Sequence, residues 1–191
     1  MVNKFDPDAH HRLCSPERLR LQPVRPALEL LGLEREHVLI DLGCGPGYFL
    51  LPAARRVKTA WGLDISPAML RVARKAAAAA GVRSVRTLRI CEHCIPMPTG
   101  SANRALVVDV LHEMAAPARL LGEIRRVLAR DGQLLVIDWN GRPSPHGPPL
   151  SERIGRERAR GLLARAGFRK ITAHHIYKHH YALLAEKSPP G

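Results

Sequence analysis

The chain has 191 residues, of which 46% are hydrophobic, and a formal net charge of +13. That length suits one domain with its own core. The polar first segment argues against a secreted protein. No apolar run approaches the roughly 18 residues that span a bilayer, which argues against a membrane-spanning protein. We therefore expect a cytoplasmic protein without a membrane span, whose four cysteines are free thiols.

Strand-like apolar runs alternate with helix-like stretches along the sequence. In chain order the pattern predicts a helix over 16–32, a strand over 38–42, a helix over 46–57, a strand over 59–64, a helix over 67–80, strands over 85–90 and 105–111, a helix over 117–129, a turn over 130–132, a strand over 133–139, a loop over 140–149, a helix over 151–166, and strands over 168–176 and 180–187. This alternation predicts an α/β fold around a mostly parallel sheet, with an antiparallel pair at the C-terminus.

Three glycines stand between the first predicted strand and the helix after it, in the segment VLIDLGCGPG. Gly43, Gly45 and Gly47 remove Cβ atoms and permit positive φ where a ligand approaches the backbone. Asp41 precedes them at the end of the strand. Because ligands of open α/β sheets bind beyond the carboxyl ends of the strands, this turn is the predicted binding site.

A second acid, Asp64, ends the next predicted strand. A carboxylate in that position can accept hydrogen bonds from both hydroxyl groups of a ribose, so the pair of motifs predicts a ligand that contains adenosine. A dinucleotide fingerprint would need a third glycine where Tyr48 stands, and the G-K-[ST] sequence of a phosphate-binding P-loop is absent. The spacing G-x-G-x-G with a preceding acid resembles motif I of class I S-adenosylmethionine-dependent methyltransferases.

The resemblance extends along nearly the whole chain. The segments IDLGCGPGYF, LDISPAML, IPMPTGS, VLHEM, RVLARDGQLLVIDW, LLARAGF and HHYALLAEK occur in the expected order. Together they resemble the small methyltransferases of the ubiquinone/menaquinone-biosynthesis type. The resemblance implies a seven-stranded Rossmann-like fold with helices on both faces of the sheet, in which residues 1–35 form a helical lid segment and 36–191 the core of a single domain. It also implies S-adenosylmethionine as the cofactor.

The same resemblance implies the site. In it Asp41 faces the amino-acid end of the cofactor, Asp64 takes the ribose hydroxyls, and Asp109 lies near the methyl group. The implied cofactor-binding set is Asp41, Gly43, Cys44, Gly45, Gly47, Asp64, Ile65, Met69, Cys91, Glu92 and Asp109. The chain departs from the pattern in two places. Related sequences usually carry an acid that reads the adenine amino group where Cys91 or Glu92 falls here, and only Glu92 could accept strongly. They also tend to carry an Asp near Asn103.

His112 and Glu113 follow the strand that ends near Asp109. His112 is the better candidate for a catalytic base because an imidazole titrates near neutral pH, and the alternative is that both residues only begin the next helix. The segment CEHC, 91–94, resembles half of a zinc site, which Cys14, His10 and His11 could complete, but free thiols beside the adenine pocket are the preferred interpretation and no metal is predicted.

The predicted function is methyl transfer to a small-molecule acceptor. The net charge of +13 keeps RNA or a ribosomal protein open as the acceptor, although the basic residues are dispersed and few aromatic side chains are present to stack on bases. A third alternative is a catalytically silent module that only binds the cofactor. The segment up to Gln22 and the loop 140–150 are the predicted lids of the site.

Overall fold

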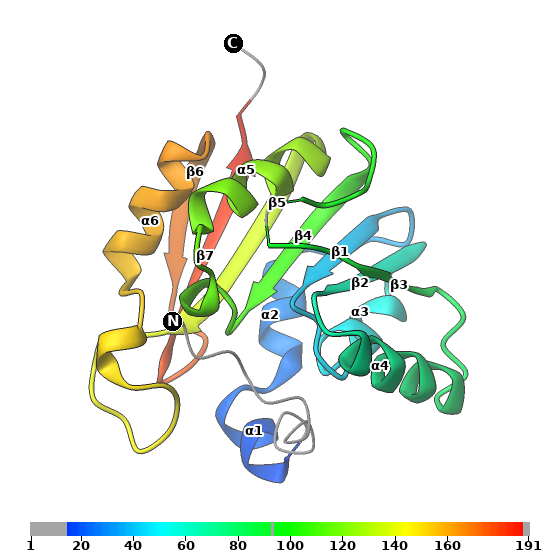
Figure 1. The fold of residues 1–191 in the computed structure, drawn as a ribbon, viewed down its shortest axis with the longest axis horizontal. Helices are drawn as coiled ribbons and strands as arrows, with labels where there is room; N and C mark the ends of the chain where they lie inside the picture. The colour runs from blue at the N-terminus through cyan, green and yellow to red at the C-terminus, as the bar shows by residue number, and fades with distance from the viewer. Residues whose placement is uncertain (1–14, 93, 189–191) are drawn as a thin grey trace.

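The computed structural model describes residues 15–92 and 94–188. Their strands form one seven-stranded sheet (Figure 1). Its strands are β1 (Val38–Leu42), β2 (Thr59–Asp64), β3 (Val85–Arg89), β4 (Ala102–Val108), β5 (Leu128–Trp139), β6 (Phe168–His174) and β7 (His180–Lys187). Their order across the sheet is β3-β2-β1-β4-β5-β7-β6. All pairs are parallel except those of β7, which runs antiparallel to both β5 and β6. The predicted α/β fold with an antiparallel C-terminal strand is therefore confirmed.

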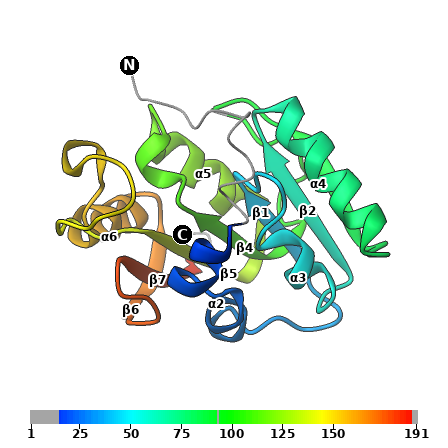
Figure 2. The ribbon, with the colours of Figure 1, turned by 90° about the horizontal axis from the view of Figure 1, so that it is seen from below.

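Helices cover both faces of the sheet, as Figure 2 shows from below. The α-helices are α1 (Pro16–Leu21), α2 (Val24–Leu30), α3 (Leu50–Ala54), α4 (Pro67–Ala79), α5 (Pro117–Val127) and α6 (Arg156–Arg165), and the short 3-10 helices are η2 (Leu111–Glu113) and η3 (Leu150–Glu152). Leu39 belongs to a buried cluster that includes side chains of α2, α3 and α4, whereas its neighbour Ile40 belongs to a second cluster that includes side chains of α5 and α6. Alternate residues of a strand point to opposite faces of the sheet, so a continuously apolar strand contributes side chains to the hydrophobic core on each face.

The predicted helix over 16–32 is wrong in one respect, because the structure divides it into α1 and α2. The break falls at Gln22 and Pro23. Proline lacks an N–H and disfavours helical geometry in the residue before it, and Gln22 accordingly adopts φ −142° and ψ 63°. The dipeptide Gln-Pro carried this signal in the sequence.

Two predictions around the central strands need correction. The strand predicted over 105–111 begins earlier and ends at Val108, because Asp109 takes a φ of 55° and turns the chain into η2. The turn predicted over 130–132 lies inside β5, where the pairing of β5 with β4 shifts register and Asp131 has a φ of 60°. A β-bulge explains both the turn-like sequence and the continuous strand.

The predicted helices over 46–57 and 151–166 are shorter in the structure. The first becomes α3, preceded by a turn over 46–49, because Gly47 has a φ of 97° that no helix accommodates. The second becomes η3 followed by α6, whose N-cap is Gly155. Among the described residues no helix is long and apolar enough to cross a membrane.

Candidate functional site

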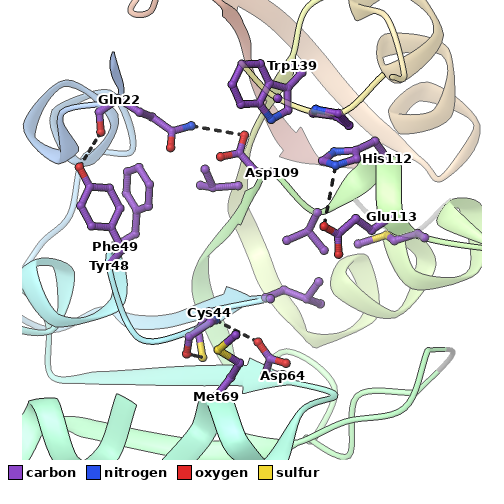
Figure 3. Close-up of a pocket in the computed structure, with 18 of the residues that line it drawn as sticks. Gln22, Cys44, Tyr48, Phe49, Asp64, Met69, Asp109, His112, Glu113 and Trp139 are labelled. Atoms are coloured by element: carbon purple, nitrogen blue, oxygen red, sulfur yellow. Dashed lines mark hydrogen bonds and ion pairs between the residues drawn. The ribbon is translucent and has the colours of Figure 1, made fainter. Parts of the chain in front are cut away.

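A cavity of about 1270 Å³ opens at the carboxyl ends of the parallel strands. It lies where the strand order reverses, since β1 sits between β2 and β4. Figure 3 shows its length: Asp64 and Met69 lie toward one end, and Asp109, His112 and Trp139 lie toward the other. Such a reversal is where open α/β sheets bind ligands, so the predicted location of the site is the location of the cavity.

The glycine turn after β1 forms the floor of the cavity. Gly43 and Gly47 have φ values of 71° and 97°, which L side chains rarely adopt. A Cβ atom on Gly43 would collide with the side chain of Val110, and one on Gly47 with Leu51. These two glycines are therefore required by the protein's own packing as well as by its backbone conformation. Cys44, between them, is buried and lines the cavity.

Asp64 stands at the end of β2 with its carboxylate in the cavity wall. Its Oδ2 accepts the N–H of Gly45 at 2.9 Å, and its Oδ1 accepts the N–H of Ser66 at 2.8 Å. Burial raises the pKa of Asp64, and these N–H bonds counter only part of the increase. The glycine turn thus fixes one oxygen of this carboxylate and the backbone of Ser66 fixes the other, and each oxygen retains a lone pair for a ligand hydroxyl.

Asp41, on β1, is 3% exposed and also lines the cavity. Its Oδ2 is buried and has no hydrogen-bond partner among the described residues. Burial, followed by the charge of Asp64, raises the pKa of Asp41 to about 7. An unsatisfied buried carboxylate oxygen at a cavity wall is a site where a ligand donor or cation would be stabilised.

Asp109 follows β4 and connects three parts of the chain. Its Oδ2 accepts a hydrogen bond from the Arg18 guanidinium at 3.1 Å, and its Oδ1 accepts one from the Gln22 amide at 3.4 Å. The Nε2 atom of His180 lies 3.2 Å from the same Oδ1. Burial alone would raise the pKa of Asp109, but the contact with His180 and the charges of His180 and Arg18 lower it overall.

His112, on η2, forms a buried pair with Asp138 of β5. Its Nδ1 lies 2.7 Å from Asp138 Oδ1, and its backbone N–H donates to Oδ2 at 3.2 Å. Burial lowers the pKa of His112, but the hydrogen bond to Asp138 and the charge of that carboxylate raise it more, so the pKa lies above its ordinary value. The Nε2 atom lies 3.9 Å from Glu113 Oε1, and both residues line the cavity.

Both predicted lid segments contribute to the cavity wall, the first through its described part, 15–22, since residues 1–14 lie outside the described residues. From α1 come Glu17, Arg18 and Leu21, and Gln22 follows; from the loop after β5 come residues 145–149. The Tyr48 hydroxyl donates to the Gln22 carbonyl at 2.9 Å, and the Arg18 guanidinium lies 4.8 Å from the Tyr48 ring centroid. Tyr48, which replaces the third glycine of a dinucleotide motif, thus holds α1 over the turn.

Four other predicted residues surround the end of the cavity nearest Asp64. Ile65, Met69 and the pair Cys91–Glu92 all line it, and Ile65 is 38% exposed. Asn103 does not, because its Oδ1 accepts the N–H of Val38 at 2.8 Å, at the opposite end of β1. Its departure from the expected Asp therefore affects strand pairing and not the cavity.

The zinc alternative rests partly on Cys14, His10, His11 and His93, which lie outside the described residues. Within 15–92 and 94–188, no group of three or more His, Cys, Asp or Glu side chains is placed to hold a metal ion. Cys44, Cys91 and Cys94 are free thiols.

Sequence reasoning missed Asp138, Arg18 and Trp139 as parts of the site. Asp138 had a detectable signal, because all four central parallel strands carry an Asp at their carboxyl ends: Asp41, Asp64, Asp109 and Asp138. Arg18 had none, since its contact with Asp109 joins residues far apart in the sequence. Trp139 lies 4.1 Å from the His180 ring, centroid to centroid, with the Arg153 guanidinium 5.2 Å from its own ring centroid.

The donor set fits S-adenosylmethionine. A carboxylate with free lone pairs suits a ribose diol, apolar side chains at Ile65, Met69 and Ile90 suit the faces of an adenine ring, and Asp41 suits the positive groups of the methionyl end. Nothing bulky separates these groups, since they line one continuous cavity.

Comparisons with known proteins agree with this geometry. Residues 40–136, half of the chain, match the family described as methyltransferase domain. Demethylmenaquinone methyltransferase of Thermus thermophilus is 30% identical over 149 residues, which cover 77% of this chain and 61% of that protein. The uncharacterized methyltransferase YcgJ of Bacillus subtilis is 29% identical over 117 residues, which cover 61% of this chain and 45% of that protein. The chain thus spans less than two thirds of the length of these relatives.

A solved structure extends the likeness to the whole fold. The S-adenosylmethionine-dependent methyltransferase from Aquifex aeolicus superimposes with a TM-score of 0.91 and 25% identity, over 97% of this chain and 100% of that one. Sequence family, fold and donor set therefore agree: this chain belongs to the methyltransferase domain family and is an S-adenosylmethionine-dependent methyltransferase domain.

Proposed function

We propose that this chain methylates a small acceptor molecule, neutral or cationic, that binds between the cofactor and the His112–Asp138 pair. The observation that carries the proposal is the two-ended cavity, with Asp64 at one end and His112 at the other (Figure 3). One end suits adenosine, and the other offers a base, so an acceptor seated at Asp109 would touch both.

Four groups hold the cofactor in this proposal. Asp64 binds the ribose, the slot of Ile65 and Met69 takes the adenine, and Asp41 and Asp109 face the methionyl end. When bound, S-adenosylmethionine supplies a methyl group that is already activated toward nucleophiles. The protein's task is then to position the acceptor and to keep water out, which can account for much of the rate.

His112 removes the acceptor's proton. Asp138 accepts from His112 Nδ1, which leaves Nε2 as the acceptor atom in that tautomer. The side chain of Asp138 is 0% exposed and also accepts the N–H of Trp139 at 2.7 Å, so this carboxylate cannot easily turn away from the imidazole. A hydroxyl, an ammonium or an acidic carbon as acceptor would each benefit from such a base.

The charge of the cavity wall favours a small acceptor over RNA. Its described carboxylates are Glu17, Asp41, Asp64, Glu92, Asp109, Glu113 and Glu152, while Arg18 is the one Lys or Arg among the described lining residues. In a chain of net charge +13, the cavity therefore carries the opposite sign. Like charges disfavour entry of a polyanion, whereas neutral phenols and protonated amines meet no such barrier.

A two-step experiment tests the proposal. Calorimetry with S-adenosylhomocysteine measures cofactor binding, and a panel of hydroquinones, amines and RNA incubated with methyl-labelled S-adenosylmethionine identifies the acceptor. We expect binding and transfer to a hydroquinone or an amine. Transfer to RNA alone would contradict the small-molecule assignment, and binding without transfer to any acceptor, including a metabolite extract, would identify a silent cofactor-binding module.

A further inference from the structure

The segment after β3 contains two thiols that the proposed methyl transfer does not use. Cys91 and Cys94 are both exposed and both free, and an isolated antiparallel bridge pairs one directly with the other. The Cys91 Sγ atom lies 3.9 Å from the Cys94 carbonyl oxygen. The two side chains therefore leave the backbone at facing positions of a tight reversal.

Facing positions of this kind match the geometry of a disulfide. Residues opposite each other in an antiparallel pair have Cα atoms about 4.5–5.5 Å apart. A disulfide requires Cα atoms about 4.4–6.8 Å apart, so the backbone needs no large movement to admit the bond.

Both ends of the reversal are anchored, which keeps the thiols opposed. On one side the Ile90 N–H donates to the Asp64 carbonyl at 3.0 Å. On the other, Glu123 of α5 accepts the Ile95 N–H at 3.0 Å, and Arg126 of α5 donates to the Ile95 carbonyl at 2.7 Å.

One of the two thiols belongs to the cofactor cavity. Cys91 lines it next to Ile90 and Glu92, at the end occupied by Asp64 and Met69, whereas Cys94 does not line it. A ligand in that end of the cavity would cover Cys91. Cys44, by contrast, is 6% exposed, and burial raises its pKa, so it provides an unreactive comparison within the same protein.

We propose that Cys91 and Cys94 form a reversible intrachain disulfide, and that a bound cofactor shields this site from oxidation. With a hydroperoxide as oxidant, the thiolate of one cysteine attacks the peroxide oxygen, giving a sulfenic acid and an alcohol or water. The second thiol then attacks the sulfenic sulfur and expels water. The two thiols lose two electrons and two protons in total, and the peroxide is reduced. A dithiol reductant restores the pair.

Peroxide treatment followed by alkylation and peptide mass spectrometry tests the site in a Cys14→Ser background. We expect one monomeric product in which a single peptide holds both cysteines, lighter by two hydrogens and restored by a dithiol. Cys94→Ser is expected to abolish it. Only intermolecular disulfides, or an alkylated Cys91 with no disulfide, would overturn the proposal.

Shielding is tested by repeating the oxidation with S-adenosylhomocysteine after calorimetry has measured its Kd. If only the free protein reacts, a ligand concentration roughly ten times Kd slows disulfide formation about tenfold. An unchanged rate at that concentration would overturn the coupling to the cofactor. Because neither readout involves methyl transfer, failure of the proposed acceptor chemistry would leave both results interpretable.

Discussion

The side chains of His112 and Asp138 join η2, which follows β4, to the carboxyl end of β5, with 2.7 Å between Nδ1 and Oδ1. Asp138 also accepts two backbone N–H groups, from His112 and Trp139. The carboxylate thus fixes both the backbone that carries the imidazole and the orientation of its ring. This is the arrangement expected of a positioned base, in which one ring nitrogen is held and the other faces the reacting group.

Replacing His112 with Gln is expected to lower kcat by about 10²–10⁴-fold, the usual contribution of general acid–base catalysis. Steady-state kinetics with the acceptor that the labelling experiment identifies measures this change. Calorimetry should show S-adenosylhomocysteine affinity within about twofold of wild type, because His112 lies at the far end of the cavity from Asp64. His175→Gln, at an exposed position, is the matched control and should change neither quantity. A His112→Gln enzyme with wild-type kcat would remove His112 from the chemistry.

The pH profile of kcat should rise toward alkaline pH. A base acts in its neutral form, and the pair with Asp138 holds the pKa of His112 above its ordinary value of about 6.5. The activity is therefore expected to be low on the acid side of that pKa and to reach a plateau above it. Asp138→Asn removes the charge that raises the pKa, so its midpoint should move to lower pH while its plateau falls. A profile unchanged by Asp138→Asn would contradict the coupling of the two residues.

The sequence predicted those parts of the fold that local patterns determine. Strands β1 and β2 have the predicted ends, and α4 begins as predicted at Pro67, because apolar runs and capping residues act over a few neighbours. The glycine turn and Asp64 lie together at the cavity because the topology of a parallel sheet brings successive strand ends to one edge.

What the sequence did not reveal depends on tertiary contacts. The contact between Arg18 and Asp109 requires α1 to fold back over β4, and the bond from Tyr48 to the Gln22 carbonyl is one of the contacts that hold it there. The turn-like Arg-Asp-Gly segment became a bulge in β5 because pairing with β4 on either side outweighed the local preference.

Replacing Asp64 with Asn tests the ribose end of the cavity. The amide keeps the shape of the side chain, but it loses the charge-assisted hydrogen bonds to a diol and can accept only one of the two N–H groups of Gly45 and Ser66. We expect binding of S-adenosylhomocysteine to weaken by about 1.5–3 kcal/mol. Calorimetry measures the change. Asp131→Asn is the control, since Asp131 is exposed on the β5 bulge and Asn tolerates its positive φ. Equal affinities of the Asp64→Asn and Asp131→Asn proteins would contradict the assignment.

Asp41 should make the free protein less stable as the pH rises. Its pKa is raised from the ordinary value of 3.8 to about 7 in the folded protein, because burial and the charge of Asp64 disfavour its ionised form. The folded state therefore binds the proton more tightly than the unfolded state. The resulting stabilisation is complete below the unfolded pKa and is lost as the pH rises through about 7, and it amounts to something on the order of 4 kcal/mol.

Asp41→Asn cannot ionise, so this variant should escape that loss. Urea unfolding at pH 5 and pH 8, without cofactor, measures the free energy of unfolding of both proteins. The free energy of unfolding of the variant minus that of the wild type should increase by a few kcal/mol between pH 5 and pH 8, which is the size expected from the raised pKa of Asp41. The comparison isolates Asp41 from Asp64, whose pKa is raised in both proteins by its own burial. A difference that stays constant between the two pH values would show that Asp41 is not the group that loses its proton there.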